Sequence, residues 1–208
     1  MTRLVIFAKA PQPGTAKTRL IPALGAEGAA ELARRMLHHT LAQALGVGAQ
    51  SVELCMSPPA CAPAWQGVTL PTGIECTAQC DGDLGARMSD ALERALTQQH
   101  GPVLLMGTDC PALTAERIEE ASQQLAHHDA VLLPAVDGGY VLMGLHNACP
   151  ALFTDMAWST PVVAQETLRR MASAGLRVWQ GPRLHDIDEP ADLAHLPDDL
   201  RPAGHPTH

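Results

Sequence analysis

The chain has 208 residues and a mass of 22.0 kDa, with 46% hydrophobic and 17% charged residues. This composition excludes a disordered or fibrous chain, and no stretch approaches the roughly 20 apolar residues that span a bilayer. Fourteen Lys and Arg against 22 Asp and Glu leave a net charge of −8, which opposes the binding of nucleic acid on a broad basic face. We therefore expect a globular protein with no nucleic-acid partner and no membrane partner.

The same arguments bound the organisation of the chain. A single core suits this length, so we expect one domain over residues 1–196. Residues 197–208 carry several prolines and no periodicity, which predicts a disordered tail. The apolar run at the N-terminus is interrupted by Lys9 and is too short for a secretory signal, so we expect a cytoplasmic protein.

The six cysteines and ten histidines indicate no metal site of their own. The cysteines form no C-x-x-C pair and match no usual zinc spacing, and the histidines form no H-E-x-x-H pattern. Reduced structural thiols are the simplest interpretation in this context.

Apolar runs rich in β-branched residues alternate along the chain with segments of helical period, which predicts an α/β fold with a mostly parallel sheet. The clearest strand is 102–106, a continuous apolar run typical of a strand covered on both faces. The predicted elements, in chain order, are strand 4–8, helix 26–45, strands 51–56 and 74–78, helix 84–96, strand 102–106, helix 115–125, strands 130–136 and 140–145, helix 161–174, strand 176–179 and a short helix from about 190.

The loop after the first predicted strand is a candidate phosphate-binding segment, because ligands of open α/β sheets bind beyond the carboxyl ends of the strands. It contains the only two lysines of the chain, Lys9 and Lys17. Gly14 would let the backbone approach a ligand, and Lys17 and Arg19 would neutralise a pyrophosphate. The loop matches neither the P-loop nor G-x-G-x-x-G, and an exposed basic loop without a ligand is the alternative.

Two acidic segments are candidate metal ligands. Asp109 follows the buried strand 102–106, where a carboxylate suits Mg²⁺ or Mn²⁺ that carries substrate phosphates. The alternative is an Asp that accepts backbone N–H bonds in a tight turn. Asp188 would supply a second carboxylate or would cap the short helix that begins near Pro190.

Three further segments have two interpretations each. Asp83 precedes a helix and would cap it, with Arg87 one turn later free to meet a phosphate or an acid. Asp137 precedes two glycines, which predicts either a hairpin turn or a carboxylate that faces the substrate. Trp158 would belong to the core or form a platform for a sugar or base, and Thr160 or Ser159 would cap the helix that follows.

Five motifs in this order resemble the DUF2064 proteins, often described as glycosyltransferase A-type or radical-SAM/selenodomain-associated transferases. The resemblance runs from about residue 3 to residue 196. The motifs are F-A-K with P-G-x-x-K-T-R-L at 7–20, G-D-L-G-x-R-M at 82–88, G-T-D-C-P at 107–111, D-G-G-Y at 137–140 and D-I-D-x-P-x-D-L at 186–193. The resemblance implies a three-layer α/β/α sandwich of the nucleotide-diphospho-sugar transferase (GT-A-like) kind, shared with molybdenum-cofactor and phospholactate nucleotidyltransferases.

The resemblance also implies roles for particular residues and Mg²⁺ or Mn²⁺ as the cofactor. Lys17 and Arg19 would hold nucleotide phosphates, Asp109 would bind the metal, and Asp188 would be its second ligand. Thr108-Asp109-Cys110 replaces the D-x-D of most A-type glycosyltransferases, and no L-A-A-G-x-G loop opens the chain as in nucleotidyltransferases. The predicted site comprises the catalytic residues Asp109, Lys17 and Asp137, the nucleotide-binding residues Ala8, Lys9, Gly14, Lys17, Arg19, Asp83 and Arg87, and the substrate-binding residues Gly138, Gly139, Tyr140, Trp158 and Thr160.

Three functions are compatible with this pattern. The first is transfer of a sugar from a nucleotide-diphospho-sugar donor to a small-molecule acceptor. The second is nucleotidyl transfer, in which a phosphorylated small molecule attacks a nucleoside triphosphate and pyrophosphate leaves. The third is a non-catalytic nucleotide-binding protein.

Overall fold

A computed structural model describes residues 1–98 and 101–201 of the chain. Within these residues one seven-stranded sheet has the order β3-β2-β1-β4-β6-β5-β7. β6 is antiparallel to both of its neighbours, and the other strand pairs are parallel. The strands are β1 (Arg3–Lys9), β2 (Ser51–Ser57), β3 (Ile74–Ala78), β4 (Val103–Met106), β5 (Ala130–Pro134), β6 (Tyr140–Leu145) and β7 (Val178–Gln180). The predicted mostly parallel mixed sheet is confirmed.

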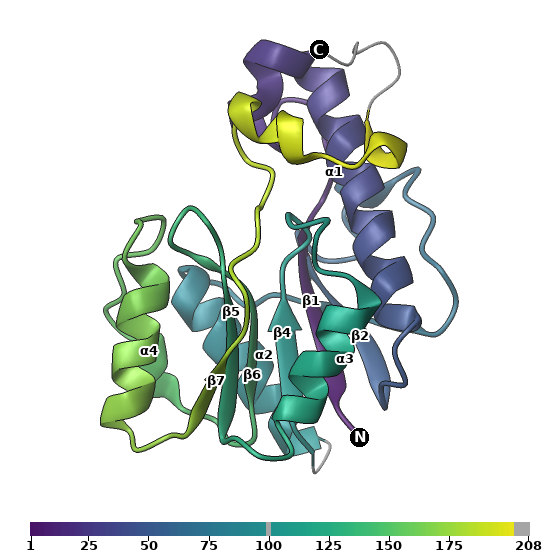
Figure 1. Ribbon diagram of the computed structural model, residues 1–208. Coiled ribbons are helices and arrows are strands. Elements are labelled where there is room, and N and C mark those ends of the chain that lie inside the picture. The colour runs from purple at the N-terminus through teal and green to yellow at the C-terminus, as the bar shows by residue number, and fades with distance from the viewer. Residues whose placement is uncertain (99–100, 202–208) are drawn as a thin grey trace.

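Four α-helices cover the two faces of the sheet and complete the predicted three-layer sandwich (Figure 1). They are α1 (Ile21–Leu45), α2 (Leu84–Gln98), α3 (Ala115–Gln124) and α4 (Val163–Ser173). Side chains of α1 and α3 share one hydrophobic cluster with the sheet, and those of α2 and α4 share the other. No helix of the described part of the chain has the length and apolar character needed to cross a membrane.

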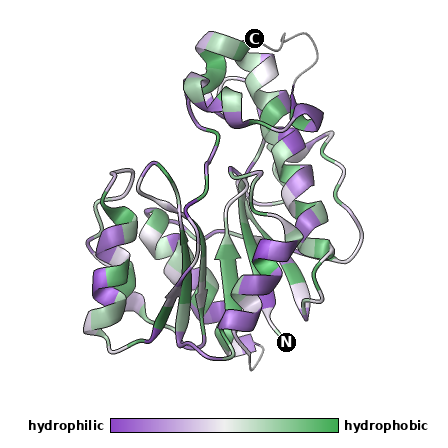
Figure 2. Cartoon of the chain, in the orientation of Figure 1, coloured by the Kyte–Doolittle hydropathy of each residue, from purple (hydrophilic) through white to green (hydrophobic). Residues whose placement is uncertain are grey.

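The alternation of side chains along the strands separates these two clusters. Leu4 and Ile6 of β1 face the layer of α1 and α3, and Val5 between them faces the layer of α2 and α4. β4 is buried along its whole length, as its apolar sequence predicts. Figure 2 shows the result as a hydrophobic centre with hydrophilic stripes on the outer faces of the helices.

The first part of α1 and the end of the described chain form a cap over the carboxyl edge of the sheet (Figure 1). A third cluster joins Leu20 and Leu32 to Ile187 and Leu200. α1 begins at Ile21, before the predicted start at residue 26. A break at Gly25, with φ 71° and ψ 168°, divides the helix, and the prediction found only the part after this break. Only glycine adopts such a conformation at little cost.

The predicted disordered tail is shorter than expected at its beginning. The segment η4 (Pro190–His195) is followed by a second 3₁₀ turn, η5 (Asp198–Leu200), whose Leu200 is buried in the cap. Burial of Leu200 and a hydrogen bond from Arg35 to the carbonyl of Arg201 connect residues 197–201 to the cap. Residues 202–208, the rest of that tail, lie outside the described residues.

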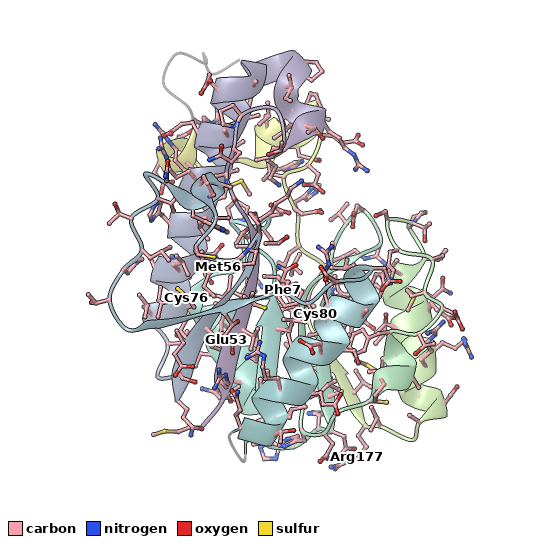
Figure 3. All side chains as sticks on the ribbon, turned by 180° about the vertical axis from the view of Figure 1, so that it is seen from behind. Phe7, Glu53, Met56, Cys76, Cys80 and Arg177 are labelled. Carbon is pink, nitrogen blue, oxygen red and sulfur yellow. The ribbon has the colours of Figure 1, made fainter. Side chains whose placement is uncertain are left out.

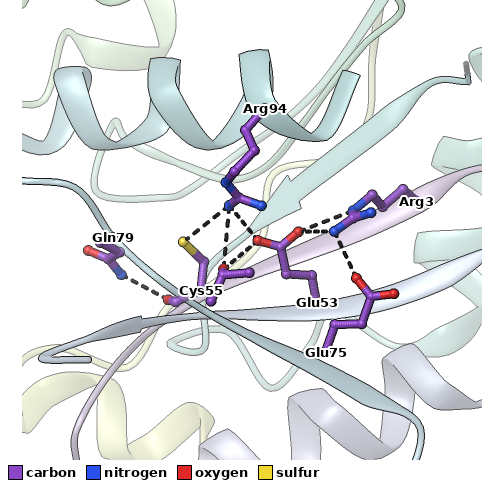
Figure 4. A network of polar contacts seen from close by, with 7 residues as sticks. Arg3, Glu53, Cys55, Glu75, Gln79 and Arg94 are labelled. Atoms are coloured by element: carbon purple, nitrogen blue, oxygen red, sulfur yellow. Dashed lines mark hydrogen bonds and ion pairs between the residues drawn. The ribbon is translucent and has the colours of Figure 1, made fainter. Parts of the chain in front are cut away.

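A buried ionic network ties α2 to the sheet on the far side from α1 (Figure 4). Glu53 of β2 is fully buried and accepts hydrogen bonds from Arg3 of β1, Arg94 of α2 and Thr77 of β3. Arg3 also contacts Glu75 at 3.0 Å. Burial disfavours the charged form of Glu53, but the hydrogen bonds from Arg94, Thr77 and Arg3 outweigh it, so the pKa of Glu53 lies below its usual value. Glu53 is therefore a buried anion with two buried or half-buried cations as partners.

Candidate functional site

A cleft of about 580 Å³ lies at the carboxyl edge of the sheet, under the cap. The loops after β1, β4 and β5 line it together with the start of α2 and residues 158–160. Viewed from behind, Phe7 lies toward this end of the sheet and Arg177 lies at the opposite end (Figure 3). The sequence-predicted residues that line the cleft are Ala8, Lys9, Lys17, Arg19, Asp109, Asp137, Gly139, Tyr140, Trp158, Thr160 and Asp188.

Lys17 bridges the two predicted metal ligands. Its Nζ lies 2.6 Å from Oδ1 of Asp109 and 2.8 Å from Oδ1 of Asp188, and it donates a hydrogen bond of 2.6 Å to the carbonyl of Ile187. Burial disfavours the ammonium, but the charges of both carboxylates and their hydrogen bonds outweigh burial and raise the pKa of Lys17. The structure thus places this lysine on carboxylates, where the sequence predicted a phosphate partner.

Local structure fixes the two carboxylates. Asp109 follows β4, and its carbonyl accepts the N–H of Ile187 at 2.8 Å, which joins the two acidic segments. Glu189, not Asp188, is the N-cap of η4 and forms a capping box with Asp192. The capping role considered for Asp188 is therefore wrong, because its carboxylate is turned to the cleft and to Lys17.

Asp186 lies close to this acidic pair and was not among the predicted site residues. Burial, together with the negative charges of Asp137, Asp188 and Asp109, raises its pKa to about 6. In the described part of the chain no group of three or more His, Cys, Asp or Glu side chains is arranged to hold a metal ion. Asp109 and Asp188 nevertheless offer hard oxygen donors on one cation, which fits a Mg²⁺ or Mn²⁺ ion that completes its shell with phosphate and water.

The other cations of the loop after β1 are open to solvent. Nζ of Lys9 donates to the carbonyl of Thr15 at 3.0 Å. Arg19 is 63% exposed and approaches Glu189 only to 3.8 Å. An incoming anion would therefore meet two cations whose contacts with other protein groups are weak.

Asp83 and Arg87 lie beside the cleft and do not line it. Oδ1 of Asp83 accepts the N–H of Ala86 at 2.8 Å, which confirms the predicted cap of α2. Arg87 donates from Nε to the carbonyl of Gly82 at 2.9 Å, so the guanidinium stabilises the same turn. The structure assigns both residues to the start of α2.

Two predicted glycines also lie outside the cleft lining. Gly14 has φ 77°, so the loop after β1 needs glycine there for its backbone conformation. Gly138 has φ 95° and packs so closely on Pro161 that a Cβ would lie 2.1 Å from the Pro161 carbonyl oxygen. Gly138 therefore joins the β5–β6 turn to the segment before α4.

Asp137 combines the two interpretations that its sequence allowed. Its Oδ1 accepts the N–H of Gly139 at 2.7 Å inside the β5–β6 hairpin, and the residue also lines the cleft. Tyr140 follows at the start of β6, with its hydroxyl 3.8 Å from the sulfur of Met88. Burial raises the pKa of Tyr140 far above its usual value, so this phenol stays neutral.

Trp158 belongs to both the core and the cleft wall, since it packs against the cluster of α2 and α4 and lines the cleft. Ser159 and Thr160 do not cap α4, contrary to the prediction. The Thr160 hydroxyl donates to the carbonyl of Ala157, and the N–H of Ala164 near the helix start donates to the carbonyl of Gly138. The β5–β6 turn thus accepts an N–H of the first helical turn, for which the N-cap residue Val162 supplies no side-chain partner.

Several cleft residues were missed from the sequence. Gln79 lies just beyond β3 and donates to the carbonyl of Cys55 at 3.0 Å, and Leu84 and Met88 come from the first turns of α2. The rule that carboxyl ends of strands carry ligand-binding residues identifies Gln79 if it is applied to this edge strand. Nothing in the sequence indicates that the apolar residues line the cleft, because they belong to the same helical stripe that builds the core.

Charge is unevenly distributed around the cleft. Its cations are Lys9 at the end of β1 and Lys17 and Arg19 in the loop that follows, and Asp109 and Asp188 pair with Lys17. The lining from α2, β6 and the loop before α4, named the neutral side, consists of apolar, aromatic and hydroxyl residues: Leu84, Met88, Tyr140, Val141, Trp158, Ser159 and Thr160. Asp137 of the β5–β6 turn adjoins this side, and its charge also acts on Asp186. The cleft therefore has an ionic side and a nearly neutral side.

Several known proteins are similar to this chain in sequence or in fold. The chain is 25% identical over 183 residues to a 2-phospho-L-lactate guanylyltransferase of Methanosarcina mazei, covering 87% of this chain and 80% of that protein. A Desulfovibrio desulfuricans G20 protein, provisionally assigned as a nucleotide-diphospho-sugar transferase, superposes with a TM-score of 0.87 at 32% identity, covering 98% of this chain and 89% of that one. Rv0371c of Mycobacterium tuberculosis H37Rv, solved with manganese, superposes with a TM-score of 0.58 at 15% identity, covering 94% and 96%.

These similarities agree with the order of motifs around the cleft. The fold is that of the nucleotide-diphospho-sugar transferases, as the resemblance implied. A family model described as an uncharacterized protein conserved in bacteria, DUF2064, matches residues 40–160, which include Asp109 and the β5–β6 turn. The chain is a member of the DUF2064 family.

Proposed function

We propose that the cleft binds a nucleotide-diphospho-sugar and transfers its sugar to a small-molecule acceptor. The observation that carries this proposal is the meeting of Lys17, Asp109 and Asp188 at one rim of the sheet, within a cleft that also has a neutral side. The ionic side would hold the diphosphate, and the neutral side would hold the sugar and the acceptor.

The loop after β1 supports the diphosphate assignment. Lys9 and Arg19 are exposed cations at the cleft, and Lys17 adds a third cation. Negative charge develops on the diphosphate as it leaves, so cations fixed near it stabilise the transition state more than the ground state.

Asp109 and Asp188 would hold a divalent ion, Mg²⁺ or Mn²⁺, because both present a carboxylate oxygen to one cation. Bound with the nucleotide, such an ion supplies Lewis-acid stabilisation of the departing diphosphate. The position of Asp186 among three other acids supports the need for added positive charge at this rim.

The neutral side of the cleft supports an uncharged sugar and an uncharged acceptor. A phosphorylated acceptor would bring a second cluster of negative charge, which requires nearby Lys or Arg. The residues described on this side supply apolar, aromatic and hydroxyl contacts instead, among them Leu84, Met88, Tyr140, Trp158 and Thr160.

Asp137 would act on the acceptor. Its hydrogen bond from the N–H of Gly139 orients the carboxylate at the cleft wall. In the proposed reaction the acceptor hydroxyl oxygen bonds to the anomeric carbon as the bond from that carbon to the diphosphate oxygen breaks. The hydroxyl proton passes to Asp137, and the nucleoside diphosphate leaves on the side of Lys17 and Arg19.

Nucleotidyl transfer is the second candidate, and similarity to a guanylyltransferase along most of the chain favours it. In that reaction a phosphate of the acceptor would attack the α-phosphorus of a nucleoside triphosphate, and pyrophosphate would leave. The same cations and carboxylates would serve, but the acceptor phosphate would have to sit near the neutral side.

Product analysis separates the candidates. The purified protein would be incubated with panels of nucleotide-diphospho-sugars and nucleoside triphosphates, with Mg²⁺ or Mn²⁺ and a mixture of hydroxyl and phosphorylated acceptors. We expect release of a nucleoside diphosphate, abolished in Asp109→Asn. Pyrophosphate release instead would favour nucleotidyl transfer, and thermal stabilisation by nucleotide without either product would favour a non-catalytic nucleotide-binding protein.

A further inference from the structure

Lys17 occupies the place between two carboxylates that a divalent ion would take. Its ammonium contacts Asp109 and Asp188 at 2.6 and 2.8 Å, and the backbone carbonyl of Ile187 completes a set of three oxygens. The lysine side chain is only 6% exposed, whereas the two carboxylates are 52% and 38% exposed. The cation is therefore enclosed, and its carboxylate partners remain open toward the cleft.

The backbone holds Lys17 in this position. Lys17 is one of only three non-glycine residues with positive φ in the described chain, at φ 48° and ψ 44°. This left-handed conformation is unfavourable for a residue with a Cβ, and it persists where surrounding contacts require it. Here the Lys17 carbonyl also accepts the N–H of Leu20, whose side chain is fully buried in the cap.

An ammonium and a divalent ion cannot share these oxygens. Mg²⁺ and Mn²⁺ need direct contact with carboxylate oxygens. The Lys17 ammonium already contacts these oxygens, offsets one of the two negative charges and blocks the approach of the ion. A nucleotide diphosphate would offer Lys17 an alternative anion, and would itself supply oxygens to the metal.

We propose that Lys17 is the internal counter-ion of the nucleotide-free protein, and that nucleotide phosphates must draw it away before the divalent ion binds Asp109 and Asp188. Metal and nucleotide then bind cooperatively, and each raises the affinity of the protein for the other by the same factor. This inference rests on the proposed function in one respect, the assignment of Asp109 and Asp188 as metal ligands.

Lys9, at the end of β1 directly before this loop, provides a matched control. It lines the cleft, but its Nζ bonds to the backbone carbonyl of Thr15, and no ion pair of Lys9 occurs among the described residues. Removing its charge changes the net charge of the loop as much as removing that of Lys17. It leaves Lys17 paired with both carboxylates, however.

The test is a titration with Mn²⁺ alone, in which electron paramagnetic resonance measures the concentration of the free ion. We expect Lys17→Met to bind Mn²⁺ about tenfold more tightly than the unaltered protein, a typical size for coupling between two sites. Lys9→Met and the charge-conserving Lys17→Arg are expected to bind Mn²⁺ as weakly as the unaltered protein. Adding Asp109→Asn to Lys17→Met is expected to remove the gain, which shows that the gain arises at the carboxylate pair.

A second titration keeps the inference testable if Lys17→Met does not fold. GDP and UDP are added in turn to the unaltered protein, with protein-free samples to correct for Mn²⁺ bound by nucleotide alone. We expect at least one of them to raise Mn²⁺ affinity about tenfold. The inference would be overturned if the nucleotide-free, unaltered protein bound Mn²⁺ as tightly as Lys17→Met does, or bound it tightly with an affinity that neither nucleotide changes. Either result would leave the proposed function standing. Mn²⁺ binding that Asp109→Asn does not weaken would overturn the metal assignment of the proposed function.

Discussion

Gly85 packs so closely against Trp158 that no side chain fits on the glycine. A Cβ on Gly85 would lie 2.9 Å from the indole nitrogen of Trp158 and 2.6 Å from the carbonyl oxygen of Phe153. Gly85 is in the first turn of α2, and Trp158 belongs to the loop before α4. The close contact joins two walls of the cleft, so the shape of the neutral side depends on a residue without a side chain.

Gly85→Ala tests this contact. Overpacking a filled site costs about 1–3 kcal/mol of unfolding free energy, and we expect the indole of Trp158 to be displaced toward solvent. Gly48→Ala is the control, because a Cβ at Gly48 meets nothing within 4 Å. Urea unfolding and acrylamide quenching of tryptophan fluorescence measure both effects. Equal stability and quenching in the two variants would contradict the close packing.

Arg170 holds the loop that carries Trp158. Its guanidinium donates to the carbonyls of Ala151, Thr154 and Asp155. Arg170→Ala is expected to raise hydrogen exchange of amides in residues 150–160 by about tenfold or more, since local opening follows the loss of such contacts.

Arg169→Ala is the matched control for Arg170. Arg169 and Arg170 both pair with Glu166, but Arg169 is 64% exposed, and we expect its removal to leave exchange in the loop unchanged. Hydrogen exchange followed by mass spectrometry distinguishes the two variants. Similar protection of residues 150–160 in both would show that the carbonyl contacts do not hold this loop.

Glu53→Gln is expected to lower the unfolding free energy by about 3 kcal/mol, because it leaves buried guanidinium charge without its anion. Glu75→Gln removes an acid from the same Arg3 but is 54% exposed, so its cost should stay below about 1 kcal/mol. Denaturant unfolding at neutral pH measures both. Equal costs would contradict the burial of Glu53.

The acid limb of the stability profile tests the same residue. The folded-state pKa of Glu53 lies below its usual 4.5. Its contribution to stability is therefore present above pH 4.5 and is lost as pH falls through the lower folded-state value. Glu53→Gln should lose less stability than the unaltered protein as pH is lowered below about 4.5. A parallel loss in both proteins would contradict this assignment.

The cysteines should differ in reactivity. Burial raises the pKa of Cys110 to about 11, and Cys55 is also buried, whereas Cys61 and Cys76 are exposed. At neutral pH we expect a thiol reagent to label Cys61 and Cys76 quickly and the two buried thiols only after unfolding. Peptide mapping of the labelled protein gives the order, and rapid labelling of Cys110 in the folded state would contradict its position.

Much of this fold follows from sequence patterns. Strands 74–78 and 140–145 were predicted with the observed limits, because polar or glycine-containing turns flank them. The buried Glu53 was not predicted, since the positions of its cationic partners depend on strand register and on α2. The single-domain organisation of residues 1–196 stays a prediction, and a single unfolding transition in the urea experiments would support it.

The candidate site, like the fold, was predicted from the sequence only in part. The rule that ligands bind at the carboxyl ends of strands brought Lys17, Asp109 and Asp188 to one cleft correctly. The rule could not show that the lysine would bond to the acids, because their separation depends on how the cap packs over the sheet. Asp83 forms the helix cap that the sequence predicted, and neither Asp83 nor Arg87 lines the cleft. Their nucleotide-binding role stays a prediction, because a helix-capping turn and a phosphate loop use the same residue types.

The most direct test of the account is a crystal structure with UDP or GDP and Mn²⁺, in which anomalous scattering locates the metal. The account predicts an anomalous peak at the oxygens of Asp109 and Asp188, nucleotide phosphates beside Lys9 and Arg19, and the ammonium of Lys17 moved from the carboxylates to a phosphate. Nucleotide bound outside this cleft, or Mn²⁺ at other residues while Lys17 keeps both carboxylates, would contradict it.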